Sequence, residues 1–184
     1  KELPITGQFL VAYFIFSDGI STATGAAAQF GATELNMSST EIFILLLLVI
    51  AACAIACVVF IGLEKRFVAL TAKRILMFNL VIMGCCTIYA MVALTTKIEF
   101  YIMGFVFGAM MGSASAFQRT IFSSMVPVGH EAEYFSLYEV TDRGTAWIGP
   151  LLTVAVSTAT GSFRDAFGSL LVFFVVGILI LIPF

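Results

Sequence analysis

The sequence has few charged residues. Only 11% of its 184 residues are Asp, Glu, Lys or Arg, whereas soluble globular domains carry about 25% charged residues. Hydrophobic residues make up 61% of the chain, and the mean hydropathy is +1.09. A soluble domain of this size needs a polar surface that so few charges cannot provide. We therefore expect an integral membrane protein.

Metal-ligating residues are also scarce. His130 is the one histidine, and no two cysteines have Cys-x-x-Cys spacing, so the ligand set of a structural zinc site is missing. Cys53, Cys57, Cys85 and Cys86 all lie inside apolar stretches, which is typical of small buried hydrophobic residues. The net charge is −2, and the chain has no basic tract that would bind nucleic acid. We expect no metal, no cofactor and no nucleic-acid partner.

A signal-peptide pattern is missing at the start of the chain. The opening KELPITGQ has no apolar core behind a basic region. The chain begins with Lys1 rather than Met and ends in the apolar run ILILIPF. These features are typical of a piece of a longer polypeptide, so we expect residues 1–184 to form one transmembrane domain of such a chain.

Long apolar segments dominate the sequence. A helix needs about 20 apolar residues to cross a hydrocarbon core of about 30 Å. The pattern predicts an all-α membrane protein, a bundle of six transmembrane helices joined by short loops. The predicted spans are residues 8–30, 41–63, 75–94, 100–117, 134–160 and 166–184.

Basic residues in the loops predict the orientation. Loops on the cytosolic side of a membrane protein carry an excess of Lys and Arg. Six such residues fall on one side of the predicted bundle and two on the other, so both termini should face the cytosol. The larger group is Lys1, Lys65, Arg66, Lys73, Arg74 and Arg119, and the smaller group is Lys97 and Arg164.

Polar residues recur along the first predicted span. Asp18, Thr22, Gly25 and Gln29 follow i, i+4, i+7 and i+11 spacing, which places them on one helix face. Asp18 lies near the middle of the span, where a charged side chain is costly and normally faces a bundle interior or a water-filled cavity. This face is either a cavity wall whose carboxylate binds an amine or carries a proton, or a structural hydrogen-bonding face. The depth of Asp18 favours the cavity wall.

The fourth predicted span contains a glycine repeat. Gly104, Gly108 and Gly112 form G-x-x-x-G-x-x-x-G, and small residues on one face let two helix backbones approach closely. The repeat predicts a packing face, where helices could also slide during gating.

Three charges interrupt the apolar stretch LYEVTDRGTAWIGPLL, residues 137–152. Glu139 and Arg143 stand at i and i+4 and can pair along a helix. Asp142 then lacks a partner in its own segment, and Arg119 is the nearest candidate on the same side of the membrane. These four residues are predicted to form either a gate that closes the cytosolic end or a static interfacial cluster.

The same stretch contains a helix breaker. Pro150 has no N–H, so the carbonyl of Ala146 loses its helical partner, and Gly149 loosens the helix further. We expect a kink or hinge at Gly149 and Pro150, because transporters use broken helices to line cavities. Trp147 lies one turn earlier and either forms the floor of a substrate pocket or packs against lipid headgroups.

Three stretches resemble a known family. They are FLVAYFIFSDGISTATGAAAQFG, FQRTIFSSMVPVGHEAEYFSLYEVTDRGTAWIGPLL and STATGSFRDAF. They resemble the second half of the autophagy-related protein 22 family, vacuolar amino-acid effluxers within the major facilitator superfamily. Residues 127–150 are the most specific part, with EAEYF, LYE, TDRG and W-x-G-P in the family's order. The loop after the second span departs from the superfamily pattern, with Glu64 where Asp is usual.

The resemblance implies a twelve-span transporter made of two six-helix halves, with this chain as spans seven to twelve. Its partners would be an amino-acid substrate, the bilayer of the vacuolar membrane and the N-terminal half of the same protein. The implied function is the release of leucine and other neutral amino acids to the cytosol after autophagic breakdown, by alternating access.

Two other classes compete with a transporter. An intramembrane aspartyl protease would need a Gly-x-Gly-Asp context, but the local sequences are FSDG and VTDRG, so we do not expect an enzyme. A non-transporting membrane scaffold linked to autophagy is compatible with the glycine repeat and the short loops. The polar face from Asp18 to Gln29 argues against a scaffold, which has no need for one.

Overall fold

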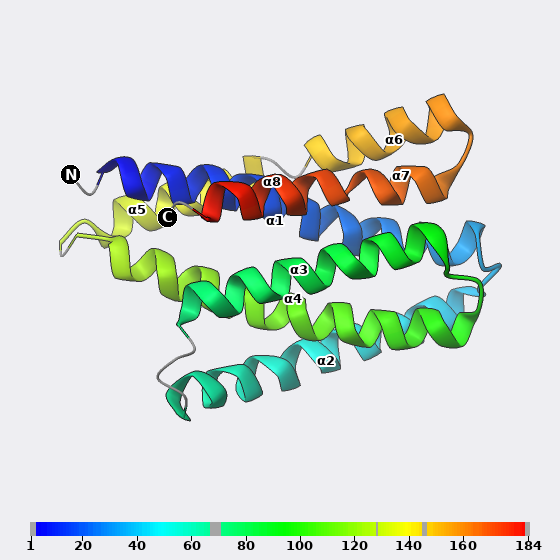
Figure 1. The fold of residues 1–184 in the computed structure, drawn as a ribbon, viewed down its shortest axis with the longest axis horizontal. Helices are drawn as coiled ribbons and strands as arrows, with labels where there is room; N and C mark the ends of the chain where they lie inside the picture. Colours follow the sequence, from blue (N-terminus) through cyan, green and yellow to red (C-terminus); the bar gives the residue numbers. More distant parts are fainter. Residues whose placement is uncertain (1–2, 67–70, 128, 145–146, 183–184) are drawn as a thin grey trace.

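The computed structural model describes residues 3–66, 71–127, 129–144 and 147–182, which form a bundle of α-helices with no strand in these ranges (Figure 1). The helices in chain order are α1 (Leu3–Thr33), α2 (Ser39–Arg66), α3 (Ala72–Val92), α4 (Lys97–Met125), α5 (Glu131–Gly144), α6 (Ile148–Thr160), α7 (Phe163–Ser169) and α8 (Leu171–Leu181).

Within the described residues, five helical segments are long and apolar enough to cross a membrane. They are Gly7–Thr33, Ser39–Glu64, Ala72–Val92, Lys97–Met125 and Phe163–Leu181, the last of which combines α7 and α8. A sixth apolar helix, α6, has only 13 residues. The all-helical structure with several apolar helices is consistent with the expected membrane bundle. The helices extend beyond most of the predicted spans because their first and last turns also accept polar residues.

The interval 134–160, expected as one span, is two helices. α5 ends at Gly144 and α6 begins at Ile148. Pro150 is the third residue of α6, where a missing N–H costs nothing because the first N–H groups of a helix have no partner. In a continuous helix its ring would instead clash with the carbonyl four residues earlier. Residues 145–146 lie outside the described residues, and the kink or hinge expected at Gly149 and Pro150 falls in the first turn of α6.

Helices α2 and α6 lie at opposite edges of the bundle, with α1, α3 and α4 between them (Figure 1). The start of α1 and the end of α8 meet at one end, where Gln8 Nε2 donates to the carbonyl of Ile180 at 3.3 Å. The start of α3 joins them, because Lys73 Nζ donates to the carbonyl of Ile182 at 3.2 Å. We call this end of the bundle the terminal end.

The glycine repeat of α4 packs against α2. A Cβ atom added to Gly108 would lie 2.6 Å from the carbonyl oxygen of Val49, and one added to Gly112 would overlap the backbone of Cys53. One added to Gly104 would meet a leucine side chain of α2 at 2.7 Å. The three glycines thus bring the two backbones into direct contact.

Aromatic rings hold the terminal end together. The rings of Tyr13 and Tyr138 stack with their centroids 4.3 Å apart, and Phe122 lies 4.9 Å from Tyr138. Phe9 and Phe135 extend the cluster on either side of Phe122. Each such pair adds about 0.5–1.5 kcal/mol to the effect of burial. The cluster joins α1, α4 and α5.

Ion pairs hold the opposite end. Arg164 Nε lies 3.2 Å from Glu34 Oε2, and its Nη2 donates to the carbonyl of Leu94 at 2.6 Å. Lys97 Nζ lies 2.8 Å from Glu41. The first group ties α7 to the ends of α1 and α3, and the second ties α4 to α2. These contacts make the bundle a unit at this end, apart from α6.

We predict that Gly108→Ala destabilises the protein, because the methyl group must displace backbone atoms of Val49. The expected loss is roughly 1–3 kcal/mol of unfolding free energy, as for overpacked cores. The measurement is the thermal midpoint of the full-length protein in detergent. Gly62→Ala is the matched control, since its added Cβ would meet nothing within 4 Å. Equal midpoints for the two variants would contradict the packing role.

Candidate functional site

A groove runs along the bundle between α1 and α6. Its volume is about 420 Å³. The groove is open rather than enclosed, and it lies beside the first turn of α6. The lining residues are Ser21, Thr22, Gly25, Ala26, Gln29, Pro150, Thr153, Val154, Ser157, Thr158 and Phe163.

The α1 wall of the groove follows the predicted polar face. Thr22, Gly25 and Gln29 line the groove together. Asp18, one turn before Thr22, does not line it, because α6 covers the carboxylate and leaves only 2% of the residue exposed. The spacing thus predicted the direction of this face correctly but could not show that its acid is covered.

The α6 wall adds hydroxyl groups that the sequence reasoning missed. Pro150, Thr153, Val154, Ser157 and Thr158 follow i, i+3, i+4, i+7 and i+8 spacing, which is one face of a helix. This spacing was the available signal. Thr153 Oγ1 donates to the carbonyl of Gly149 at 2.8 Å, so its oxygen can still accept a hydrogen bond from a solute.

Gly149 is the point of closest approach between the two walls. A Cβ atom added to it would overlap the hydroxyl of Thr22 and lie 3.0 Å from Asp18 Oδ2. A glycine therefore lets the first turn of α6 lie directly on Asp18 and Thr22. Any larger residue would force the helices apart.

Three oxygen atoms beneath Gly149 form no hydrogen bond. They are Oδ1 and Oδ2 of Asp18 and Oγ1 of Thr22, all fully buried. The backbone N–H of Gly149 faces the carboxylate, but not with the geometry of a hydrogen bond. A buried polar group without a partner costs roughly 1–3 kcal/mol. These three oxygens lie close together at the covered end of the groove, which makes them candidates for binding a solute.

The charge at this point is one-sided. No Lys, Arg or His lines the groove, and Asp18 is the one acidic residue at its covered end among the described residues. The start of α6 offers the positive end of a helix dipole to the carboxylate, which favours a negative charge there. The site is therefore suited to a cation or to a neutral polar solute.

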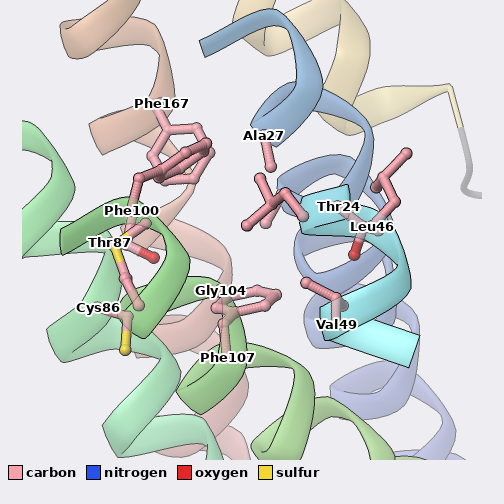
Figure 2. Close-up of a pocket in the computed structure, with 13 residues that line it drawn as sticks. Thr24, Ala27, Leu46, Val49, Cys86, Thr87, Phe100, Gly104, Phe107 and Phe167 are labelled. Atoms are coloured by element: carbon pink, nitrogen blue, oxygen red, sulfur yellow. The ribbon is translucent and has the colours of Figure 1, made fainter. Parts of the chain in front are cut away.

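A second cavity is too small for such a solute. It lies between α1, α2, α4 and α7, where Thr24, Val49, Phe107 and Phe167 surround it (Figure 2). Its volume is about 40 Å³, and a single water needs roughly 10–15 Å³ in the same measure. The groove between α1 and α6 is the candidate site because it combines sufficient volume with hydroxyl groups from both of its walls.

The other predicted residues lie away from the groove. Trp147 immediately precedes α6 and is 63% exposed, outside the groove lining. Arg119 and Glu139 are exposed on α4 and α5. The side chains of Asp142 and Arg143 lie outside the described residues, so the gate remains a prediction. In the described ranges, no three His, Cys, Asp or Glu residues cluster as a metal site would require.

The fold and the groove define the class of the molecule, a multi-pass α-helical membrane protein with a hydroxyl-lined groove beside the start of a short helix. A family model described as "Vacuole effluxer Atg22 like" matches residues 1–184. The chain belongs to this family, and the resemblance noted in its sequence is confirmed.

Curated relatives agree with this assignment. Autophagy-related protein 22 of Kluyveromyces lactis is 31% identical over 177 residues, which cover 92% of this chain and 36% of the relative. The proteins of that name from Cryptococcus neoformans and Botryotinia fuckeliana are 29% and 28% identical, over 98% and 89% of this chain. The chain spans about a third of the length of these relatives.

We predict that Gly149→Ala separates α6 from α1, because its methyl group would overlap the Thr22 hydroxyl. The thermal midpoint of the full-length protein should fall by the equivalent of roughly 1–3 kcal/mol. Gly25→Ala should not lower it, since Gly25 lines the same groove but its added Cβ meets nothing within 4 Å. A midpoint as high for Gly149→Ala as for Gly25→Ala would show that the contact is not tight.

We also predict that the groove admits water. Ser157→Cys, in a protein whose four native cysteines are replaced by serine, should react with a charged thiol reagent that cannot enter lipid. Val172→Cys is the matched control, because Val172 is 58% exposed on α8 in purely apolar surroundings. Labelling of both positions at the same rate, measured by a mass shift, would rule out a selective aqueous groove.

Proposed function

We propose that this chain is the second half of a twelve-span transporter of the vacuolar membrane. It carries leucine and other neutral amino acids to the cytosol after autophagic degradation, by alternating access. Both termini face the cytosol, the side on which the loop lysines and arginines are concentrated.

The observation that carries the proposal is the groove between α1 and α6. Its volume of about 420 Å³ falls within the range of roughly 300–1,000 Å³ that is usual for small-molecule sites. Hydroxyls from both helices can replace the hydrogen bonds that a polar solute loses when it leaves water. Ala26, Val154 and Phe163 add apolar surface for an uncharged side chain.

The position of α6 at the edge of the bundle supports movement of the α6 wall of the groove. α6 packs mainly on α1 and α7 and lies at the edge of the bundle (Figure 1). The remaining helices are joined by the glycine contact, the aromatic cluster and the ion pairs. A short helix at the edge, which takes part in none of these three kinds of contact, can change its angle without disturbing that unit. Closure at the cytosolic end by Asp142 and Arg119 remains part of the proposal.

The length of the relatives supports a second half. The chain spans about a third of them, so they contain enough additional sequence for further spans. Only 17% of the apolar window of α2 is buried within this chain. Its outward face, with Phe43, Leu47 and Ile50, is free to contact lipid or the other half. A scaffold would explain neither the hydroxyl-lined groove nor the unpaired acid beneath it.

We predict that the full-length protein in proteoliposomes exchanges leucine in a counterflow assay, and that Ser157→Phe abolishes this exchange by filling the groove. The rate should fall at least about tenfold, the effect of losing roughly 1.4 kcal/mol of binding. Ala155→Phe is the control, because Ala155 is exposed on the same helix outside the groove lining.

The assay separates two failures. No exchange of leucine or of a mixed amino-acid pool by the native protein would reject the transporter and favour a scaffold. Exchange that Ser157→Phe and Ala155→Phe reduce equally would keep the transporter but move its substrate path away from this groove.

A further inference from the structure

We infer that Asp18 and Thr22, under the first turn of α6, form the subsite that binds the ammonium group of the substrate. The inference rests on the proposed function, since it assigns one part of that substrate to particular atoms. It also assigns a role to Gly149, the residue that covers the subsite.

The first argument is the number of atoms. Asp18 Oδ1, Asp18 Oδ2 and Thr22 Oγ1 are three buried oxygens without a hydrogen bond, on successive turns of one helix. A primary ammonium group has three N–H donors that point in different directions. One such group could therefore satisfy all three oxygens.

The second argument is the charge. The carboxylate of Asp18 is 98% buried, and the described residues that line the adjoining groove include no cation. Hydrogen bonds between an ionised donor and an ionised acceptor are about twice as strong as neutral ones. An ammonium group gains this strength, whereas an anionic substrate group at this point would be repelled.

Other cations fit the subsite less well. A hard metal ion takes about six oxygen ligands, and only three unpaired side-chain oxygens converge here. The first backbone groups of α6 also present N–H rather than C=O to the carboxylate. A single proton on Asp18 would supply one donor for three oxygens.

The position of the subsite fits a molecule that extends along α1. Thr22 belongs both to the subsite and to the groove lining. A solute whose ammonium group lies between Asp18 and Thr22 would place the rest of its length toward Gly25 and Gln29. The hydroxyl of Thr158 and the apolar surface of Val154 lie on the opposite wall.

Gly149 makes the subsite closable. In this structure Gly149 packs so closely on both residues that an added Cβ would overlap the Thr22 hydroxyl, so the ammonium group can enter only when the start of α6 moves away. α6 is a short helix of 13 residues that begins at Ile148, so Gly149 lies in its first turn. The structure thus shows the covered arrangement, and a tilt of α6 would uncover the subsite toward the groove.

The experiment compares two leucine derivatives as competitors of leucine counterflow by the full-length protein. Leucinamide keeps the ammonium group and lacks the carboxylate, whereas N-acetyl-leucine keeps the carboxylate and lacks the ammonium group. We expect leucinamide to compete and N-acetyl-leucine to be at least about tenfold weaker. Equal competition by N-acetyl-leucine overturns the inference and leaves the proposed transporter intact.

Variants locate the ammonium group on these atoms. Thr22→Val should raise the KM for leucine about three- to tenfold, because it removes one hydrogen-bonding oxygen at constant shape. Thr22→Ser should restore the native KM. Asp18→Asn should raise the KM at least about tenfold and abolish the advantage of leucinamide over N-acetyl-leucine.

Thr24→Val is the matched control. Thr24 lies two residues further along α1, bonds to the carbonyl of Ile20 at 2.9 Å and faces the small apolar cavity (Figure 2). An equal rise in KM for Thr24→Val and Thr22→Val would indicate general damage to α1 and overturn the assignment. Absence of leucine exchange by the native protein would overturn the proposed function and this inference together.

Discussion

The constraint on which this structure depends is that a helix in a membrane must satisfy its own backbone hydrogen bonds. Hydrocarbon offers no partner for a free N–H or C=O group, so spanning segments remain continuous helices wherever they face lipid. α6 begins at Ile148 and has Pro150 in its first turn, where a proline is tolerated because the first N–H groups of a helix have no partner. This helix start lies beside the polar groove and over the buried Asp18, so a helix end and a buried acid occur at the same place.

The remaining helices are joined by contacts of three kinds, each at its own depth. Glycines bring α2 and α4 into backbone contact in the middle of the bundle, aromatic rings close the terminal end, and Arg164 and Lys97 hold the opposite end. α6 takes part in none of them and lies at the edge. The helices that these contacts join thus include α1, which carries Asp18 and Thr22, while the helix that covers them, α6, packs on α7 and α1 without any of these contacts. This division suits a carrier whose binding groups stay fixed while a short helix opens and closes over them.

Buried unpaired oxygens in a membrane bundle call for an explanation, because each one lowers stability. Between α3 and α4, Asn79 Nδ2 donates to Ser113 Oγ, although Asn79 Oδ1 has no partner. Asp18 and Thr22 have no such partner, although α6 packs directly against them. A substrate that enters the neighbouring groove during transport would supply the missing hydrogen-bond donors.

The sequence by itself determined the class of protein, its α-helical character and the family, because hydrophobic length and a specific motif order are local properties. It also determined that Thr22, Gly25 and Gln29 share a face with Asp18, since helical periodicity fixes this. Only the tertiary structure decided what that face meets. The contact of Gly149 with Asp18, the hydroxyls of Thr153 and Ser157 on the opposite wall, and the ion pair of Arg164 with Glu34 join residues far apart in the chain. Periodicity gives the direction of a side chain but not its neighbour, because helix packing is set by the fit of whole surfaces.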